Sequence, residues 1–139
     1  MADETFHLAY FQNWKGSETL LFSCNDVSSL LLLESVIARL RAAKDNAVEF
    51  HTLPFVRSHD SVAVVGSLVA VDSGAFRDGA NRFFRWERST EGWANVTTQI
   101  RSLAVHGHAS HQYLDGPVDK ITVELSLGEY SDEWWQVQA

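Results

Sequence analysis

The alternation of apolar and polar residues is most regular near the carboxyl end of the chain. The apolar positions are Ile121, Val123, Leu125 and Leu127, and the polar positions that alternate with them are Lys120, Thr122, Glu124 and Ser126. Successive side chains of a β-strand point to opposite sides of its sheet. The alternation therefore predicts a strand with one buried face and one face in water.

Two other segments carry apolar residues at helical spacing. The first stripe consists of Leu30, Leu33, Ile37 and Leu40, and the second consists of Trp93, Val96, Ile100 and Leu103. Asn25 or Asp26 can cap the first helix with a side-chain oxygen, and Thr90 can cap the second. Gly107 can end the second helix because glycine readily adopts the left-handed backbone conformation. The sequence therefore predicts two helices, each with one buried face.

Further strands are predicted where β-branched and aromatic residues lie between turn-forming residues. They span residues 5–12, 18–24, 48–53, 61–72 and 82–88. The element order is then ββαβββαβ, which predicts a single α+β domain over residues 1–139. We expect a mostly antiparallel sheet of about six strands with both helices on one face. Residues 5–54 and 61–127 share the order ββαβ and form a candidate pseudo-repeat.

The composition is that of a folded, acidic protein. Apolar residues make up 45% of the chain and aromatic residues 12%, a content too rich for a disordered chain. The formal net charge is −7, and no cluster of lysine or arginine reverses it locally. Such a chain repels the phosphates of nucleic acids and attracts basic groups. We therefore expect no nucleic-acid partner and a protein partner of basic character.

Cysteine content and the absence of long apolar runs point to a cytoplasmic protein. Cys24 is the one cysteine, so no internal disulfide can form. Residues 1–4 are acidic where a secretory signal would be basic. No apolar run is longer than four residues, as at residues 30–33, whereas a bilayer crossing needs about twenty. We expect neither a membrane span nor a bound cofactor.

Residues 106–115 hold three of the six histidines and offer the strongest candidate chemistry. The candidate metal ligands are His106, His108, His111 and Asp115. Their atoms suit zinc, which needs three or four converging ligands, but the stretch is expected to cross a helix end and a loop. Ser110 beside His111 is a weaker candidate nucleophile and base, and Tyr113 a candidate proton donor. The alternatives are a small metal-dependent enzyme or hydrolase, or ordinary surface histidines.

The segment after the alternating strand combines carboxylates with aromatic rings. The candidate partner-binding residues are Glu129, Tyr130, Asp132, Glu133, Trp134 and Trp135. Exposed tryptophan beside acidic residues suits a protein-binding hot spot with a polar rim. The alternatives are that this segment folds back over the sheet, or that it forms the contact of a structural homodimer.

Residues 111–115 together with residues 123–130 resemble small uncharacterised bacterial proteins, some of which look like toxin-neutralising immunity proteins. The resemblance implies a direction and no residue roles. Since no nucleophile elbow or phosphate-binding motif is present, we expect a non-enzymatic protein. The leading hypothesis is a cytoplasmic protein-binding domain, of the immunity-like kind that the resemblance implies, which uses its acidic aromatic segment.

Overall fold

The computed structural model describes residues 5–79, 82–107, 109–115 and 121–138. The strands in this part of the chain are β1 (Phe6–Trp14), β2 (Ser17–Cys24), β3 (Ala47–Glu49), β4 (Val56–Ser58), β5 (Ala63–Leu68), β6 (Gly74–Arg77), β7 (Phe83–Arg88), β8 (Ser110–Asp115) and β9 (Thr122–Leu127). The α-helices are α1 (Val27–Arg41), α2 (Thr90–His106) and α3 (Asp132–Gln138), and a short 3-10 helix, η1, covers Phe50–Thr52. The predicted α+β class is confirmed.

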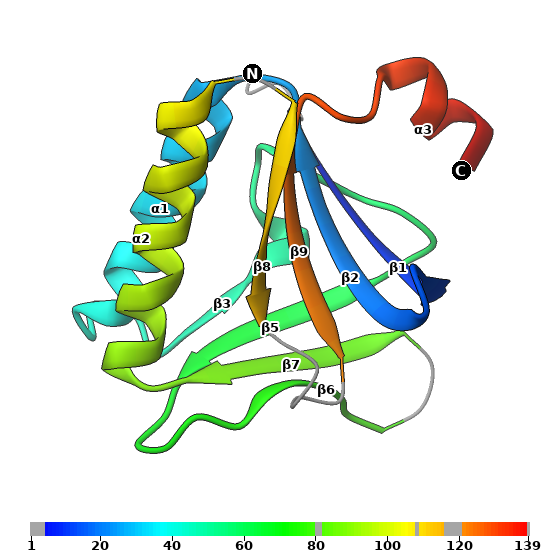
Figure 1. Cartoon of the computed structure of the whole chain (residues 1–139). Coiled ribbons are helices and arrows are strands. Elements are labelled where there is room, and N and C mark those ends of the chain that lie inside the picture. Colours follow the sequence, from blue (N-terminus) through cyan, green and yellow to red (C-terminus); the bar gives the residue numbers. More distant parts are fainter. Residues whose placement is uncertain (1–4, 80–81, 108, 116–120, 139) are drawn as a thin grey trace.

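The strands form two mixed sheets (Figure 1). The five-stranded sheet has the order β4-β1-β2-β9-β8, and the four-stranded sheet has the order β3-β5-β7-β6. Parallel pairs join β1 to β4, β2 to β9 and β5 to β7, so the prediction of one mostly antiparallel sheet of six strands is wrong in detail. These parallel partners are far apart in sequence, and alternation within one strand carries no information about its neighbour.

Both predicted helices form, and their predicted apolar stripes are buried. α1 and α2 pack side by side on one side of the sheets, and α3 lies on the opposite side of the five-stranded sheet (Figure 1). The side chain of Asp26 caps α1 by accepting from the Ser29 N–H, as predicted. Ser89 rather than Thr90 caps α2, and Gly107 ends it at φ 66°. Among the described residues, no helix has the length and apolarity that a bilayer crossing requires.

The strand order has an internal symmetry. With η1 and β4 set aside, the series β1-β2-α1-β3-β5 and β6-β7-α2-β8-β9 have the same order of strands and helix, and each hairpin lies in one sheet with the last two strands of the other series. This symmetry places β5 in the first unit, whereas the predicted pseudo-repeat puts residues 61–72 in the second. Common ancestry of the two units stays a prediction, because the topology shows an arrangement and no more.

Candidate functional site

The five-stranded sheet has an inner face toward α1 and α2 and an outer face toward α3. Along β9, Val123 and Leu125 lie in the main core, and the alternating residues Glu124 and Ser126 point to the outer face. Both polar residues are 0% exposed, so the prediction of a face in water is wrong at these positions. The β1-β2 turn and the segment leading into α3 cover them, which the alternation within β9 does not encode.

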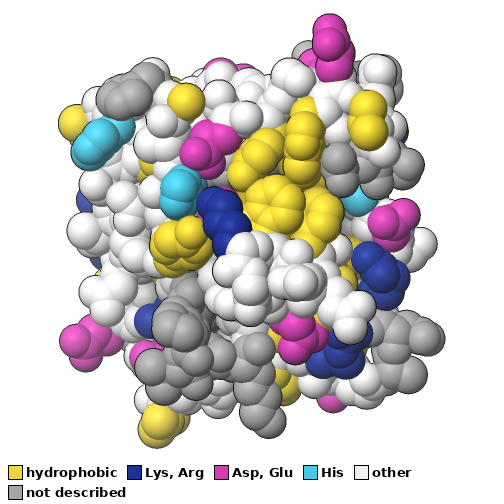
Figure 2. Space-filling model, turned by 45° about the vertical axis from the view of Figure 1, so that its right-hand side comes forward, with side chains coloured by type: hydrophobic (Ala, Val, Ile, Leu, Met, Phe, Trp, Pro, Cys, Tyr) yellow, Lys and Arg dark blue, Asp and Glu magenta, His cyan; other side chains and the backbone are white. Residues whose placement is uncertain are grey.

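A cluster of aromatic side chains lies on the outer face, separate from the main core. This outer aromatic cluster consists of Phe11, Trp14, Tyr130, Trp134 and Trp135, packed around Ala9 and Leu21. Trp14 contacts the Trp134 ring edge to face at 5.9 Å, and Tyr130 lies 4.6 Å from Trp134. Figure 2 shows a patch of hydrophobic side chains on this side of the molecule, bordered by basic, acidic and histidine side chains. The cluster thus combines aromatic surface with a charged edge.

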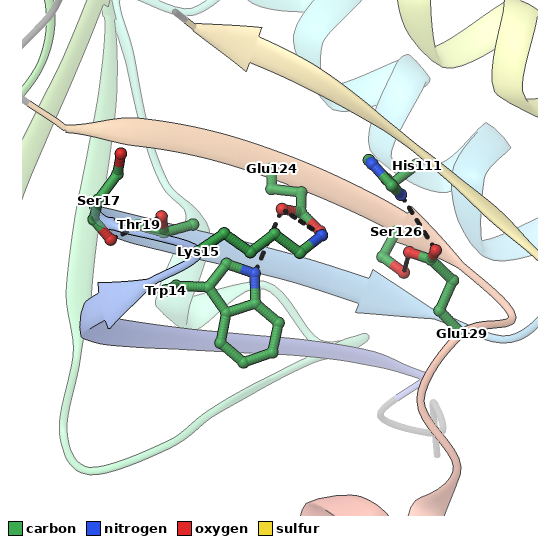
Figure 3. Close-up of polar contacts among 8 residues, drawn as sticks. All are labelled: Trp14, Lys15, Ser17, Thr19, His111, Glu124, Ser126 and Glu129. Atoms are coloured by element: carbon green, nitrogen blue, oxygen red, sulfur yellow. Dashed lines mark hydrogen bonds and ion pairs between the residues drawn. The ribbon is translucent and has the colours of Figure 1, made fainter. Parts of the chain in front are cut away.

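Glu124 is a buried carboxylate at the border of this cluster. Its Oε1 accepts a hydrogen bond from Trp14 Nε1 at 3.3 Å and lies 3.7 Å from Lys15 Nζ (Figure 3). Its Oε2 is buried and has no hydrogen-bond partner among the described residues. Desolvation opposes the charge of Lys15, but Glu124 and other nearby acidic groups outweigh it and raise the pKa of Lys15. Lys15 therefore stays protonated at neutral pH and places a positive charge beside Glu124.

The turn geometry of the first hairpin places this lysine. Lys15 and Gly16 have φ values of 54° and 87°, and the flanking residues Trp14 and Ser17 are paired. Positive φ at both central residues is the geometry of a two-residue type I′ turn, whose twist matches that of the strands. The tight turn keeps Trp14 and Lys15 next to each other over β9. Strands on either side of this turn were predicted at residues 5–12 and 18–24, whereas the contact of the turn with Glu124 was not.

Glu129 lies over the same part of β9. Its Oε1 accepts from Ser126 Oγ at 2.6 Å, and its Oε2 lies 3.0 Å from His111 Nδ1 (Figure 3). Burial raises the pKa of the Glu129 carboxyl, but the hydrogen bonds from Ser126 and His111 outweigh burial and hold it below the usual value. The ring of Tyr113 meets the His111 ring edge to face at 5.2 Å. Glu129 is therefore a fixed carboxylate and not a freely moving surface group.

His111, Glu124 and Glu129 can each offer one ligand atom, and these atoms lie within 4.8 Å of one another. This group shares only His111 with the predicted ligand set. His106 is the last residue of α2, with Nδ1 2.9 Å from Ser102 O, and it is not part of the group. His108 and the side chain of Asp115 lie outside the described residues. Glu124 was missed because its position in β9 indicates a water-facing strand residue.

A second polar group lies under α3. His7 Nδ1 and His59 Nε2 are 2.8 Å apart, and both rings stack on Trp135 at centroid distances of 4.5 and 4.6 Å. Burial, with a contribution from His59, lowers the pKa of His7 to about 4, and burial also lowers the pKa of His59. The imidazoles are therefore a neutral pair at pH 7, in which one ring donates to the other. Neither histidine was singled out in the sequence.

The structure places Glu129 over β9 and separates the other five predicted partner-binding residues into three groups. Asp132 and Glu133 are exposed on α3, while Tyr130 and Trp134 are half-buried in the outer aromatic cluster. Trp135 is only 2% exposed, so this segment folds back over the sheet.

The single cysteine lies in the main core. Burial raises the pKa of the Cys24 thiol to about 12, so the thiol stays protonated there.

No family model, no curated protein and no solved structure matches this chain.

Proposed function

We propose that this chain is a small, non-enzymatic protein-binding domain that holds a basic partner against its outer face. The observation that carries the proposal is the outer aromatic cluster, which is packed separately from the main core and bordered by carboxylates. Large rings with a polar rim are typical of binding hot spots, because the rim excludes water from the anchor. Trp14 and Trp134 are the anchors, since both rings are half-buried in the cluster and keep some surface for a partner.

Charge supports a basic partner. The chain has a net charge of −7, and Asp132 and Glu133 lie exposed next to Trp134. Such a field accelerates the approach of a positively charged protein and orients it before contact. A toxin-neutralising immunity protein is the form of this function that we favour, on the resemblance of residues 111–115 and 123–130, which implies a direction and no residue roles. We assign the protein to the cytoplasm, in keeping with its single free cysteine.

The test compares face variants with a control of equal charge. The first variant is Trp134→Ala, and the second combines Asp132→Asn with Glu133→Gln. The control combines Glu49→Gln with Glu91→Gln, which removes two exposed acidic charges elsewhere. A basic protein is first isolated on the immobilised wild-type chain, and its dissociation constant and association rate are then measured with each purified variant in the presence of a chelator.

We expect Trp134→Ala to weaken binding by about thirtyfold, the effect of losing a hot spot of about 2 kcal/mol. The paired neutral variant should slow association at low salt, and the control should bind like the wild type. Equal weakening by the control, or wild-type binding by Trp134→Ala, would overturn the proposal. Sedimentation of the wild type alone distinguishes the homodimer, since self-association that Trp134→Ala abolishes would assign the face to a second copy.

A further inference from the structure

Three side chains with metal-ligating atoms meet on the outer face from neighbouring segments. His111 lies in β8, Glu124 in β9, and Glu129 in the connection from β9 to α3. The backbone brings them together, because Gly128 at φ 72° turns the chain after β9 and its N–H donates to Cys24 O at 2.8 Å. This turn carries Glu129 back over β9, where its carboxylate reaches His111 and Ser126 (Figure 3).

The burial of Glu124 is a separate observation that points to a ligand. A fully buried carboxylate is costly unless several partners compensate it. Among the described residues Glu124 has two such partners, the Trp14 indole at 3.3 Å and the Lys15 ammonium at 3.7 Å, and both contact Oε1. The other oxygen, Oε2, has no hydrogen-bond partner in the part of the chain that the structure describes. The buried carboxylate therefore keeps an unused oxygen, and one of its two oxygens lies within 4.8 Å of ligand atoms of His111 and Glu129.

The geometry points to a site for one divalent transition-metal ion, held by His111, Glu124 and Glu129. An imidazole nitrogen with two carboxylate oxygens is a donor set that suits Zn²⁺ and similar ions, and it leaves a fourth position for water or a partner's side chain. The two carboxylates carry two negative charges, which one divalent ion neutralises. Magnesium and calcium fit less well, because both prefer oxygen ligands alone.

Lys15 is the internal competitor for this site. Its ammonium now supplies one positive charge beside Glu124, and its side chain is 48% exposed, so it can move into solvent when a metal ion enters. The ion would take the place of the proton in the His111–Glu129 hydrogen bond, and that proton would pass to solvent. The ligand atoms farthest apart, now separated by at most 4.8 Å, would have to approach to about 3.5 Å, the separation that bonds of about 2.1 Å impose in a tetrahedral site. His111 Nδ1 and Glu129 Oε2, now 3.0 Å apart, would move slightly apart to reach it.

The test uses the full chain, purified without a metal-affinity tag and freed of metal with a chelator that is then removed. Zn²⁺ binding is measured by calorimetry, and the visible absorption of bound Co²⁺ reports the coordination geometry. The variants are Glu124→Gln, which removes a ligand charge, and Lys15→Met, which removes the competitor. His106→Ala is the control, because His106 is a candidate ligand outside the group of three. Glu129→Gln replaces Glu124→Gln if circular dichroism shows that the latter does not fold.

We expect the wild type to bind one Zn²⁺ per chain and to bind Mg²⁺ far more weakly. Loss of the Glu124 ligand should weaken Zn²⁺ binding by more than about 100-fold, a larger effect than the loss of an outer-shell partner. Lys15→Met should bind Zn²⁺ about fivefold more tightly, the equivalent of removing one surface ion pair. The control should match the wild type.

Two results would overturn the inference. One is the absence of Zn²⁺ and Co²⁺ binding in both the wild type and Lys15→Met. The other is binding that survives Glu124→Gln and Glu129→Gln but is lost in His106→Ala, which would assign the metal to the predicted histidine stretch. The metal site stands apart from the proposed protein binding, because partner affinity is measured with a chelator present.

Discussion

The inner face of the five-stranded sheet is covered by two long helices and by side chains of the four-stranded sheet, whereas the outer face is covered by one helix of seven residues and the β1-β2 turn. Leu8, Phe22 and Leu125 on the inner face belong to a core that extends through both sheets and both long helices. The outer face buries Leu21 and Trp135 as well, but it places them next to Glu124 and a pair of histidines. The outer face therefore mixes buried apolar side chains with a buried carboxylate and a histidine pair, whereas the sheet residues Leu8, Phe22 and Leu125 lie in an apolar core.

Because of this difference, the stability of the fold as a whole and the stability of the outer face depend on different contacts. A buried apolar side chain contributes about 1.5–3 kcal/mol, and the inner face contains many of them. The outer face depends on α3, and a helix this short is not stable unless it is packed on the sheet. We therefore expect the outer face to open without loss of the main core, which suits a surface that accepts a ligand.

The largest expected effect comes from truncating one aromatic ring on each face. Phe22 is 1% exposed and packs against Phe50 and Trp86, so Phe22→Ala should lower the free energy of unfolding by about 3–5 kcal/mol. Trp135→Ala should lower it by only about 1–2 kcal/mol, because undocking of α3 limits the loss. Urea denaturation of the two variants measures both values.

Hydrogen exchange gives the control for this comparison. In Trp135→Ala the backbone amides of α3 should exchange fast, while those of α1, α2 and the inner strands keep wild-type protection. Equal losses of unfolding free energy in Phe22→Ala and Trp135→Ala, with loss of protection throughout, would mean that both faces belong to one cooperative unit.

A pH change should act on the outer face through the histidine pair. The pKa of His7 is about 4 in the folded chain and about 6.5 in an unfolded one, so the unfolded chain binds more protons between these values. The stabilisation from the neutral His7 is therefore complete above pH 6.5 and is lost as the pH falls toward 4. The pKa difference corresponds to at most about 3 kcal/mol. Measurements of the free energy of unfolding across this range test the effect.

Charged residues near the histidine pair set how steeply the free energy of unfolding is expected to change with pH. Asp132 raises the pKa of His7 and Asp60 raises that of His59, while Arg57 lowers both. His7→Gln keeps a hydrogen-bonding group and removes the titration, so its unfolding free energy should change less between pH 7 and pH 4.5 than that of the wild type. His106→Ala removes an exposed histidine and should keep the wild-type slope. If His7→Gln shows the same slope as the wild type, the pair does not cause the loss.

The elements that the sequence predicts well are those whose burial pattern is complete within one segment. The helical stripes of α1 and α2 and the alternation of β9 predict their inner faces correctly, since one side of each packs on the main core. β8 was expected to be a loop because its outward residues, His111 and Tyr113, are polar or amphipathic and lie at a sheet edge. α3 was missed because seven residues with two adjacent tryptophans give no helical stripe.

The candidate site was predicted less well because its members come together only in the folded chain. His111 was among the predicted metal ligands, and Glu129 was among the predicted partner-binding residues. Glu124 and Lys15 were not singled out, since their contact joins the first turn to the ninth strand across the parallel pairing of β2 with β9. The sequence around Glu124 and around Lys15 gives no sign that β2 pairs with β9. The burial of Glu124 is a consequence of that pairing.

The smallest expected effect is a difference in unfolding free energy between variants of two serines that lie opposite each other on the outer face. Ser23 and Ser126 are paired across β2 and β9, and both side chains are buried. Ser126 Oγ donates to Glu129, whereas Ser23 Oγ has no partner among the described residues. Ser126→Ala should therefore cost about 1 kcal/mol of unfolding free energy, while Ser23→Ala should be neutral or slightly stabilising, because it removes a buried hydroxyl that makes no hydrogen bond. Urea denaturation with a chelator present measures both variants against the wild type. Equal costs would show that the outer face is held by side-chain packing, and that its hydrogen bonds contribute no more to stability than its unpaired hydroxyl.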